Sequence, residues 1–342
     1  MHARVAAGLV LCFVVACDGP WEEADAGADA GRRTDAGERA DAGPPEDPSR
    51  PGRVSIVDDC EVPPSPDDGA VRLEEDLTYA TVNGEALRLD VASPPDGGGD
   101  AHPLVVMIHG GAWSVGDKAD ERPRDFIRRL ASIGYVAASV NYRLATPDGE
   151  RSFPAAVEDV RCAVRWIRAR ADRWGADPSR VVAAGMSAGG HLALMLALAG
   201  DAEGFDGACG DTGPVALDGA ISYYGPTDLR ADQFTDPVGE ALIAGFLGAP
   251  ASEVPEVAER ASPLAWADAS DPAPLLVHGG GDGVVPASQS RALQATLEAL
   301  GVASTYVEVP LAPHAFAGIT EQARYRVSTC TTLAYLDDVF AP

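Results

Sequence analysis

Short apolar runs alternate with amphipathic stretches along most of the chain after residue 60. Residues 87–91 alternate between apolar and polar side chains, as in a half-buried strand, whereas residues 104–108 form an unbroken apolar run, as in a parallel strand buried on both faces. Further strands are predicted at residues 136–140, 181–184, 220–224, 275–278 and 305–309, and helices at 122–133, 154–174, 191–199, 286–300 and 321–340. This alternation predicts an α/β fold with a mostly parallel, doubly wound sheet and helices on both faces.

No linker-like break interrupts the pattern between residues 61 and 342, so this part is predicted to be one domain. One irregular insertion, residues 228–271, is rich in Ala, Pro and Glu and lies between two predicted strands. We expect it to form a small helical cap over the carboxyl ends of the strands, where pockets form in such sheets.

The chain begins with features of an export signal. Arg4 precedes an apolar stretch, residues 5–16, that is too short to span a bilayer but has the length of a signal-peptide core. Residues 14–17 resemble the lipobox of bacterial lipoproteins, which predicts a signal peptide at 1–16 and lipidation of Cys17. The alternative is an ordinary secretion signal with a chance cysteine. The protein is therefore expected to be exported, and either lipid-anchored to the bacterial cell envelope or secreted.

The next segment, residues 17–60, has a composition that disfavours folding. It consists mainly of Ala, Asp, Gly, Glu, Pro and Arg, with Asp-Ala-Gly repeats starting at Asp25, Asp29, Asp35 and Asp41. Such a segment has almost nothing to bury, so it is predicted to be a disordered acidic tether.

The net charge of the chain disfavours some classes of binding partner. The 342 residues include 52 Asp and Glu against 26 Lys and Arg, a net charge of −26, and most of this excess lies in residues 61–342. A surface this negative repels phosphate backbones and anionic lipids, which disfavours nucleic acid and leaves the lipid anchor as the expected membrane contact. Neutral or cationic small molecules are the favoured substrates. The sequence does not indicate the oligomeric state.

Four of the six cysteines remain after Cys12 and Cys17 are assigned to the N-terminal region: Cys60, Cys162, Cys209 and Cys330. Export makes disulfides plausible, and four thiols allow three connectivities. We favour Cys60–Cys330 with Cys162–Cys209, although Cys162 also fits the interior of a helix as a small core residue. Without a Cys-x-x-Cys motif, no structural metal is indicated.

The pentapeptide Gly185-Met186-Ser187-Ala188-Gly189 fits the Gly-x-Ser-x-Gly nucleophile elbow. In this motif a tight turn between a strand and a helix holds the serine hydroxyl above the sheet, and glycines are needed where side chains would clash. The predicted strand before it and the apolar helix after it are the context that the motif requires. Ser187 is therefore the candidate nucleophile.

A second small-residue loop, His109-Gly110-Gly111-Ala112-Trp113, directly follows a buried strand. Its backbone N–H groups, at Gly111 and Ala112, together with the N–H of Ala188, can hold the oxyanion of an acyl-transfer reaction. His109 is interpreted as an organiser of the turn and not as a base.

The acid and the histidine that would act with Ser187 follow from chain order, which in enzymes with a nucleophile elbow runs Ser, acid, His. Asp282 lies in a glycine-rich loop at the carboxyl end of a predicted strand, and His314 is the only histidine downstream of it. Asp228, after an earlier strand, is the competing acid.

These motifs, together with Asn141-Tyr142-Arg143-Leu144 and Phe153-Pro154-Ala155, resemble α/β-hydrolase esterases of the hormone-sensitive-lipase type, and still more the bacterial branch with feruloyl and acetyl-xylan esterases. The similarity covers residues 71–340. Ala112 departs from the third glycine of the lipase-type loop, and the segment from Thr146 to Ser152 is longer than usual.

The resemblance implies a carboxylesterase that forms an acyl-enzyme on Ser187, with His314 as base and Asp282 orienting it, and without a cofactor, since the triad has its own nucleophile and base. Trp113, Met186, Tyr223 and Phe234 are candidates for the pocket, although the core accounts for the aromatic residues equally well.

The expected substrates are short-chain esters or acyl groups on polysaccharide. The same fold and triad also fit a serine peptidase or an arylformamidase. A third possibility is a catalytically silent surface-binding protein, against which the complete set of site residues argues.

Overall fold

The computed structural model describes residues 57–341, except 68, 96–100, 147–148, 150–151, 208, 212, 231, 235–236, 317 and 320–321. The signal peptide, the lipidation site Cys17 and most of the tether lie outside the described residues, so they stay predictions.

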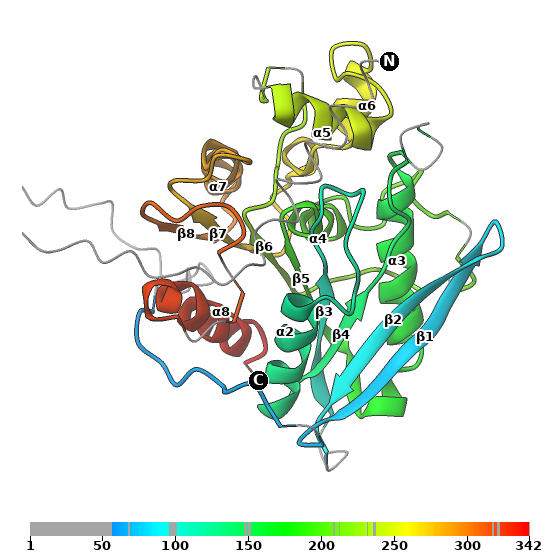
Figure 1. Cartoon of the computed structure of the whole chain (residues 1–342), viewed down its shortest axis with the longest axis vertical. Helices are drawn as coiled ribbons and strands as arrows, with labels where there is room; N and C mark the ends of the chain where they lie inside the picture. The colour runs from blue at the N-terminus through cyan, green and yellow to red at the C-terminus, as the bar shows by residue number, and fades with distance from the viewer. Residues whose placement is uncertain are drawn as a thin grey trace, which may run out of the picture. The chain divides into compact units, whose positions relative to one another are not determined.

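An eight-stranded sheet forms the centre of the described domain, in the order β1-β2-β4-β3-β5-β6-β7-β8 (Figure 1). The strands are β1 (Arg72–Val82), β2 (Glu85–Ser93), β3 (His102–Ile108), β4 (Val136–Val140), β5 (Ala176–Met186), β6 (Gly219–Tyr223), β7 (Leu275–Gly279) and β8 (Thr305–Val309). β1 pairs antiparallel with β2, and β2 with β4, whereas the other pairs are parallel. The mostly parallel sheet is as predicted.

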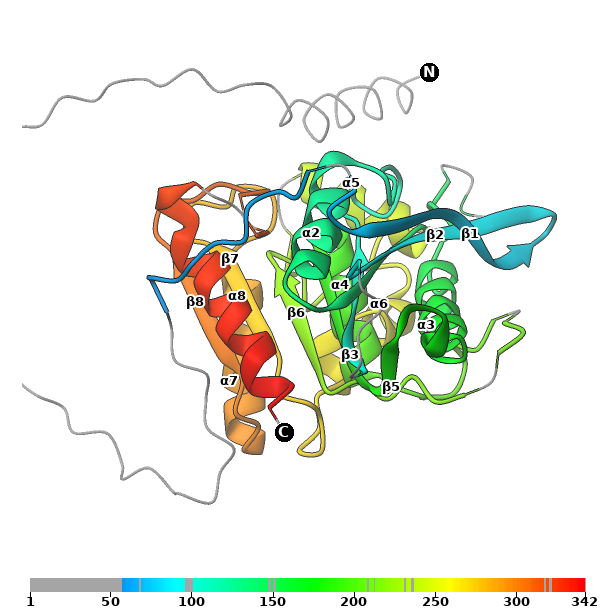
Figure 2. The ribbon, with the colours of Figure 1, turned by 90° about the horizontal axis from the view of Figure 1, so that it is seen from below.

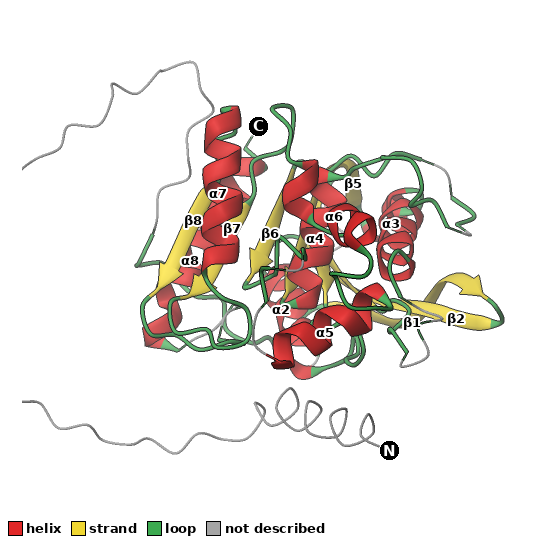
Figure 3. Cartoon of the chain, turned by 90° about the horizontal axis from the view of Figure 1, so that it is seen from above, coloured by secondary structure: helices red, strands yellow, loops and turns green. Residues whose placement is uncertain are grey.

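Helices cover both faces of this sheet. α2 (Glu121–Ser132) and α8 (Arg326–Val339) pack on one face, and α3 (Ala155–Arg168), α4 (Ala188–Leu198) and α7 (Ser288–Leu300) on the other (Figures 2 and 3). Within β3, Val105 and Met107 face α2, whereas Val106 and Ile108 face α3 and α4. Burial on both sides explains why residues 104–108 of this strand are all apolar.

The pattern of the sequence misses β1 and merges some elements. β1 contains register shifts between Glu74 and Leu77 and between Thr78 and Ala80, which interrupt the period-two signal. The helix expected at 154–174 consists of α3 and a separate 3-10 turn, η2 (Ala171–Trp174), and the one expected at 321–340 consists of η4 (Ala323–Tyr325) and α8.

The folded unit begins before residue 61. Cys60 is joined to Cys330 in α8, Val57 N–H donates to Thr331 Oγ1 at 3.0 Å, and Arg326 pairs with Asp59 at 2.8 Å. Residues 57–60, which the composition assigns to the tether, therefore belong to the domain.

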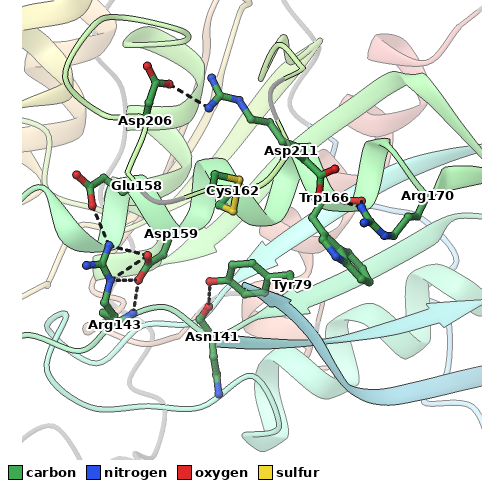
Figure 4. The surroundings of a disulfide bond; sticks show 12 residues. Tyr79, Asn141, Arg143, Glu158, Asp159, Cys162, Trp166, Arg170, Asp206 and Asp211 are labelled. Carbon is green, nitrogen blue, oxygen red and sulfur yellow. Dashed lines mark hydrogen bonds and ion pairs between the residues drawn. A yellow bond between two sulfur atoms is a disulfide. The ribbon is translucent and has the colours of Figure 1, made fainter. Parts of the chain in front are cut away.

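A second disulfide, Cys162–Cys209, fastens the long loop between α4 and β6 to α3 (Figure 4). Arginines of α3 and of the turn after it reinforce this attachment: Arg165 pairs with Asp206 at 3.0 Å and Arg170 with Asp211 at 2.9 Å. The two disulfides are the pairs that the sequence favours.

The insertion forms helices, as expected. α5 (Pro237–Leu247), α6 (Pro255–Arg260) and the 3-10 turn η3 (Pro263–Trp266) lie in residues 228–271, with α5 and α6 at one end of the domain (Figure 1). Phe246 of α5 stacks on Trp113, which follows the carboxyl end of β3. The insertion therefore covers that edge of the sheet.

Candidate active site

Ser187 occupies a strained turn between β5 and α4. Its φ is 54° and its ψ is −119°, and its N–H donates to the Tyr223 carbonyl at 2.8 Å. A methyl group on Gly185 would lie 2.1 Å from the Gly189 carbonyl oxygen, and one on Gly189 would lie 2.1 Å from that of Ile108. Only glycine fits at both positions, and this close packing fixes the turn that presents the Ser187 hydroxyl.

His314 connects Ser187 to Asp282. Its Nε2 lies 2.9 Å from Ser187 Oγ, and its Nδ1 lies 2.7 Å from Asp282 Oδ2. The three residues follow β5, β7 and β8, and so meet at the carboxyl edge of the sheet. The side chain of His314 is 16% exposed and that of Asp282 is fully buried. This geometry suits proton transfer from the hydroxyl through a reachable imidazole.

Asp282 is kept ionised by the donors around it. Its Oδ1 accepts the N–H groups of Val284 at 2.8 Å and Val285 at 2.9 Å. Burial on its own raises the pKa of Asp282, but hydrogen bonds from His278 and His314 outweigh it and hold that pKa well below its usual range.

His278 is a neighbour of this carboxylate that sequence reasoning treated only as a strand residue. Its Nε2 lies 3.3 Å from Asp282 Oδ2 and 2.9 Å from the Val285 carbonyl, and its Nδ1 lies 2.7 Å from Ser290 Oγ. The spacing of His278 four residues before Asp282 was the available signal, but such spacing indicates contact only in a known turn.

The predicted oxyanion loop lies against the nucleophile. A methyl group on Gly110 would lie 2.9 Å from the Met186 carbonyl oxygen and 3.4 Å from Ser187 Cβ. Gly111, Ala112 and Trp113 have positive φ values of 111°, 50° and 57°. This conformation costs a non-glycine residue about 1–2 kcal/mol. Among the described residues, the backbone hydrogen bonds of loops and turns include none donated by the N–H groups of Gly111 and Ala112.

His109 organises this loop, as the sequence suggests, and among the described residues no hydrogen bond joins it to Ser187. Its ring is buried and stacked on Tyr142 at 4.4 Å, and its Nδ1 lies 2.7 Å from the Gly110 carbonyl. Burial lowers the pKa of His109, although its bond to Gly110 acts in the opposite direction. A neutral, enclosed imidazole is suited to packing.

Lys118 anchors the far end of the same loop. Its Nζ lies 2.8 Å from Asp90 and 3.0 Å from Asp76, and its backbone N–H donates to Asn141 Oδ1 at 2.6 Å. Burial opposes its charge, but hydrogen bonds with Asp90 and Asp76 raise the pKa of Lys118 above its ordinary value. Sequence reasoning assigned no role to this residue.

Asp228 does not join the site. Its carboxylate accepts from Arg230 Nε at 2.8 Å and Nη2 at 2.6 Å, and the backbone beside it is held by Gln289. Asp282 is the acid that reaches His314.

The four predicted pocket residues lie in different surroundings. Tyr223 is a correction: it is fully buried, edge-on to Phe126, and its hydroxyl bonds Thr332, so it belongs to the core. Trp113 is buried against α5. The end of the Met186 side chain packs closely against Gly318, because a methyl group added to that glycine would lie 2.9 Å from Met186 Cε. Phe234 lines a cavity of about 340 Å³ together with residues of α5.

Tyr224 is an aromatic neighbour that sequence reasoning did not select. Its ring lies edge-on to His314, 4.7 Å away, and its φ of 44° turns it out of β6. A left-handed residue directly after a strand has no clear signal in the apolar pattern.

Within the described residues no helix has the length and apolar character to span a membrane, and no group of three acidic, His or Cys side chains is arranged to hold a metal ion.

Comparison with known proteins agrees with the fold. The chain is 32% identical over 250 residues to Esterase LipQ of Mycobacterium tuberculosis, which is 70% of this chain and 56% of LipQ, and 41% identical over 108 residues to Carboxylesterase NlhH of the same organism, 31% of this chain and 32% of NlhH. This chain spans about half the length of the curated relatives that it matches most extensively.

Among solved structures, a truncated carbohydrate esterase from gut microbiota has a TM-score of 0.66 at 23% identity, covering 79% of this chain and 99% of that one. Thermogutta terrifontis esterase 2, phosphoramylated by tabun, has a TM-score of 0.64 at 26% identity, covering 81% and 98%. The α/β-hydrolase fold and the esterase resemblance are thereby confirmed. Residues 89–297 match the BD-FAE family model, and the chain therefore belongs to the BD-FAE family.

Proposed function

We propose that this protein is a serine hydrolase of carboxylic esters, with Ser187 as nucleophile, His314 as general base and acid, and Asp282 as the orienting carboxylate. The observation that carries the proposal is the continuous chain of hydrogen bonds from Asp282 through His314 to Ser187 Oγ. Similarity to named esterases supports the same reaction class.

The reaction proceeds in two steps. Ser187 Oγ attacks the ester carbonyl while His314 Nε2 takes its proton, and ionised Asp282 stabilises the imidazolium. The N–H groups of Gly111, Ala112 and Ala188 hold the oxyanion, each contributing about 3 kcal/mol in comparable sites. His314 then protonates the leaving alcohol, and water attacks the acyl-enzyme by the reverse path.

The proposed substrates carry short acyl chains, either on simple alcohols or on carbohydrate. Other structures of Thermogutta terrifontis esterase 2, at 25% and 26% identity, hold propionate and butyrate, which supports a short acyl site. Turnover of p-nitrophenyl esters from acetyl to dodecanoyl, with acetylated xylan and methyl ferulate, tests this. Activity should be greatest from acetyl to butyryl, and a preference for dodecanoyl would contradict the proposal.

Ser187→Ala tests the reaction class. The wild type should hydrolyse p-nitrophenyl acetate and react with a fluorophosphonate probe, and Ser187→Ala should do neither while remaining folded. Ser132→Ala, which removes a hydroxyl at the end of α2, is the matched control and should behave as wild type. A wild type that takes no label would favour the silent binding protein, and faster cleavage of matched anilides than of esters would favour a peptidase.

Lipid attachment at Cys17 is the proposed route to the cell envelope. The wild-type chain expressed in a bacterium should fractionate with membranes, and Cys17→Ser should release it. A wild type found only in the soluble fraction would exclude the anchor.

A further inference from the structure

The backbone of the oxyanion loop is held in a conformation that its residues do not favour. Ala112 and Trp113 both have positive φ values, and Trp113 has a bulky side chain. Left-handed backbone at such residues persists only where the surrounding structure holds it. The contacts of Trp113 therefore identify what keeps this loop in place.

The Trp113 side chain is enclosed by the insertion. Its ring stacks on Phe246 of α5, with centroids 4.2 Å apart and planes 15° apart, and it is 3% exposed. Its carbonyl oxygen accepts the Ala145 N–H at 2.7 Å. These contacts fix the ring and the peptide that follows it, so the insertion supports the loop as well as covering the site.

His191 makes a further polar contact with Trp113. The indole Nε1 lies 3.2 Å from His191 Nδ1, and an indole N–H can only donate. His191 Nδ1 is therefore the acceptor, which leaves the ring proton on Nε2. That nitrogen lies 2.7 Å from the carbonyl oxygen of Ala261 in the insertion, to which it donates.

His191 also belongs to the helix that carries the nucleophile. It lies in the first turn of α4, where its backbone N–H donates to the Ser187 carbonyl at 3.0 Å. Its side chain is fully buried. One residue thus connects three segments far apart in the chain: the nucleophile turn, the oxyanion loop and the insertion.

We propose that His191 is a positioning residue for the reaction proposed above, on which this inference rests. Through Trp113 it fixes the oxyanion N–H groups relative to Ser187 Oγ, and through Ala261 it ties the insertion to the same helix. Its bonds therefore determine the rate of the acyl-transfer step, where a displacement of 1 Å can lower kcat about 10²-fold.

A double-mutant cycle on the Trp113–His191 bond tests the proposal. His191→Phe removes both ring hydrogen bonds and keeps an aromatic ring, and Trp113→Phe removes only the indole donor. Each variant should lower kcat for p-nitrophenyl acetate by about 10-fold to 10²-fold with KM changed less than about twofold. The double variant should be no slower than the slower single variant, because both act through one bond. His191→Gln, which offers an acceptor and a donor, should recover part of kcat.

His102→Phe is the matched control, because it removes another histidine-to-carbonyl bond, His102 Nδ1 to Gly134 at 2.7 Å, at the opposite end of β3. It should leave kcat unchanged. Wild-type kcat in Trp113→Phe and His191→Phe, or independent losses that multiply in the double variant, would overturn the positioning role and leave the triad intact. If His191→Phe does not fold, Trp113→Phe alone tests the proposal: a lowered kcat supports the positioning role and a wild-type kcat overturns it. A wild type with neither turnover nor fluorophosphonate labelling would overturn the proposed function and this inference together.

Discussion

The loops that carry Asp282 and His314 are held by different interactions from the loop that carries Gly111 and Ala112. Around Asp282 the contacts are directional hydrogen bonds to a buried, ionised carboxylate. Around the oxyanion loop they are a stacked pair of aromatic rings, a neutral imidazole and a buried ion pair.

Because of this difference, variants on the two sides of the site should differ in how they affect turnover and stability. Charge and tautomer matter most on the acid–base side, so an isosteric change there should lower turnover while the domain stays folded. On the oxyanion side the backbone is strained and its supports lie in the core, so a truncation there should lower stability and turnover together.

The largest expected effect is on the acid–base side. Asp282→Asn keeps the shape of the side chain but lets His314 adopt the wrong tautomer, so kcat should fall by about 10⁴-fold. Circular dichroism and the urea midpoint should show a folded domain. A variant that retains a tenth of wild-type kcat would show that Asp282 is not the orienting acid.

The next effect tests the oxyanion side. Lys118→Met leaves buried Asp90 without its cation, and the free energy of unfolding should fall by about 3–5 kcal/mol, with a loss of kcat. Asp76→Asn is the matched control, because Asp76 is 65% exposed and its pair with Lys118 should contribute less than about 1 kcal/mol. Urea unfolding measures both. Equal losses in the two variants would contradict a buried ion pair as the anchor of the loop.

A smaller effect concerns the pH dependence of stability on the oxyanion side. Burial lowers the pKa of His191 from 6.5 to about 4, against the opposing bond to Ala261. As the pH falls from about 6.5 to 4, the unfolded chain gains a proton that the folded chain does not, so about 3 kcal/mol of stability is lost. His191→Phe should lack this part of the slope in urea unfolding between pH 7 and pH 4. Parallel slopes in the two proteins would contradict it.

The catalytic candidates could be predicted because their signals are local. Gly185 to Gly189 encode a turn that only glycine can make, and the order of Ser187, Asp282 and His314 selects one histidine of six. The mostly parallel sheet was predictable for the same reason, since strands such as β3 contain an unbroken apolar run, here residues 104–108.

The supporting contacts could not be predicted because they join distant segments. His191 and Trp113 are 78 residues apart and His191 and Ala261 are 70 apart, and no periodicity links them. For Tyr223 the sequence leaves pocket and core open, because its strand is buried on both faces and lacks the alternation that tells one side from the other. An apolar run in the sequence therefore predicts that an aromatic residue is buried, but not whether it lines the pocket or lies in the core.

The buried ion pair of Lys118 with Asp90 allows loop opening to be measured by chemical modification of the lysine. Lys118 is the only lysine among the 342 residues, and its side chain is 5% exposed. Amine-directed reagents should therefore leave the ε-amine of the native protein unmodified and react with it only when the segment after the oxyanion loop detaches. The rate of acylation at this single amine would follow the local opening of the site in the unaltered protein, without any engineered label.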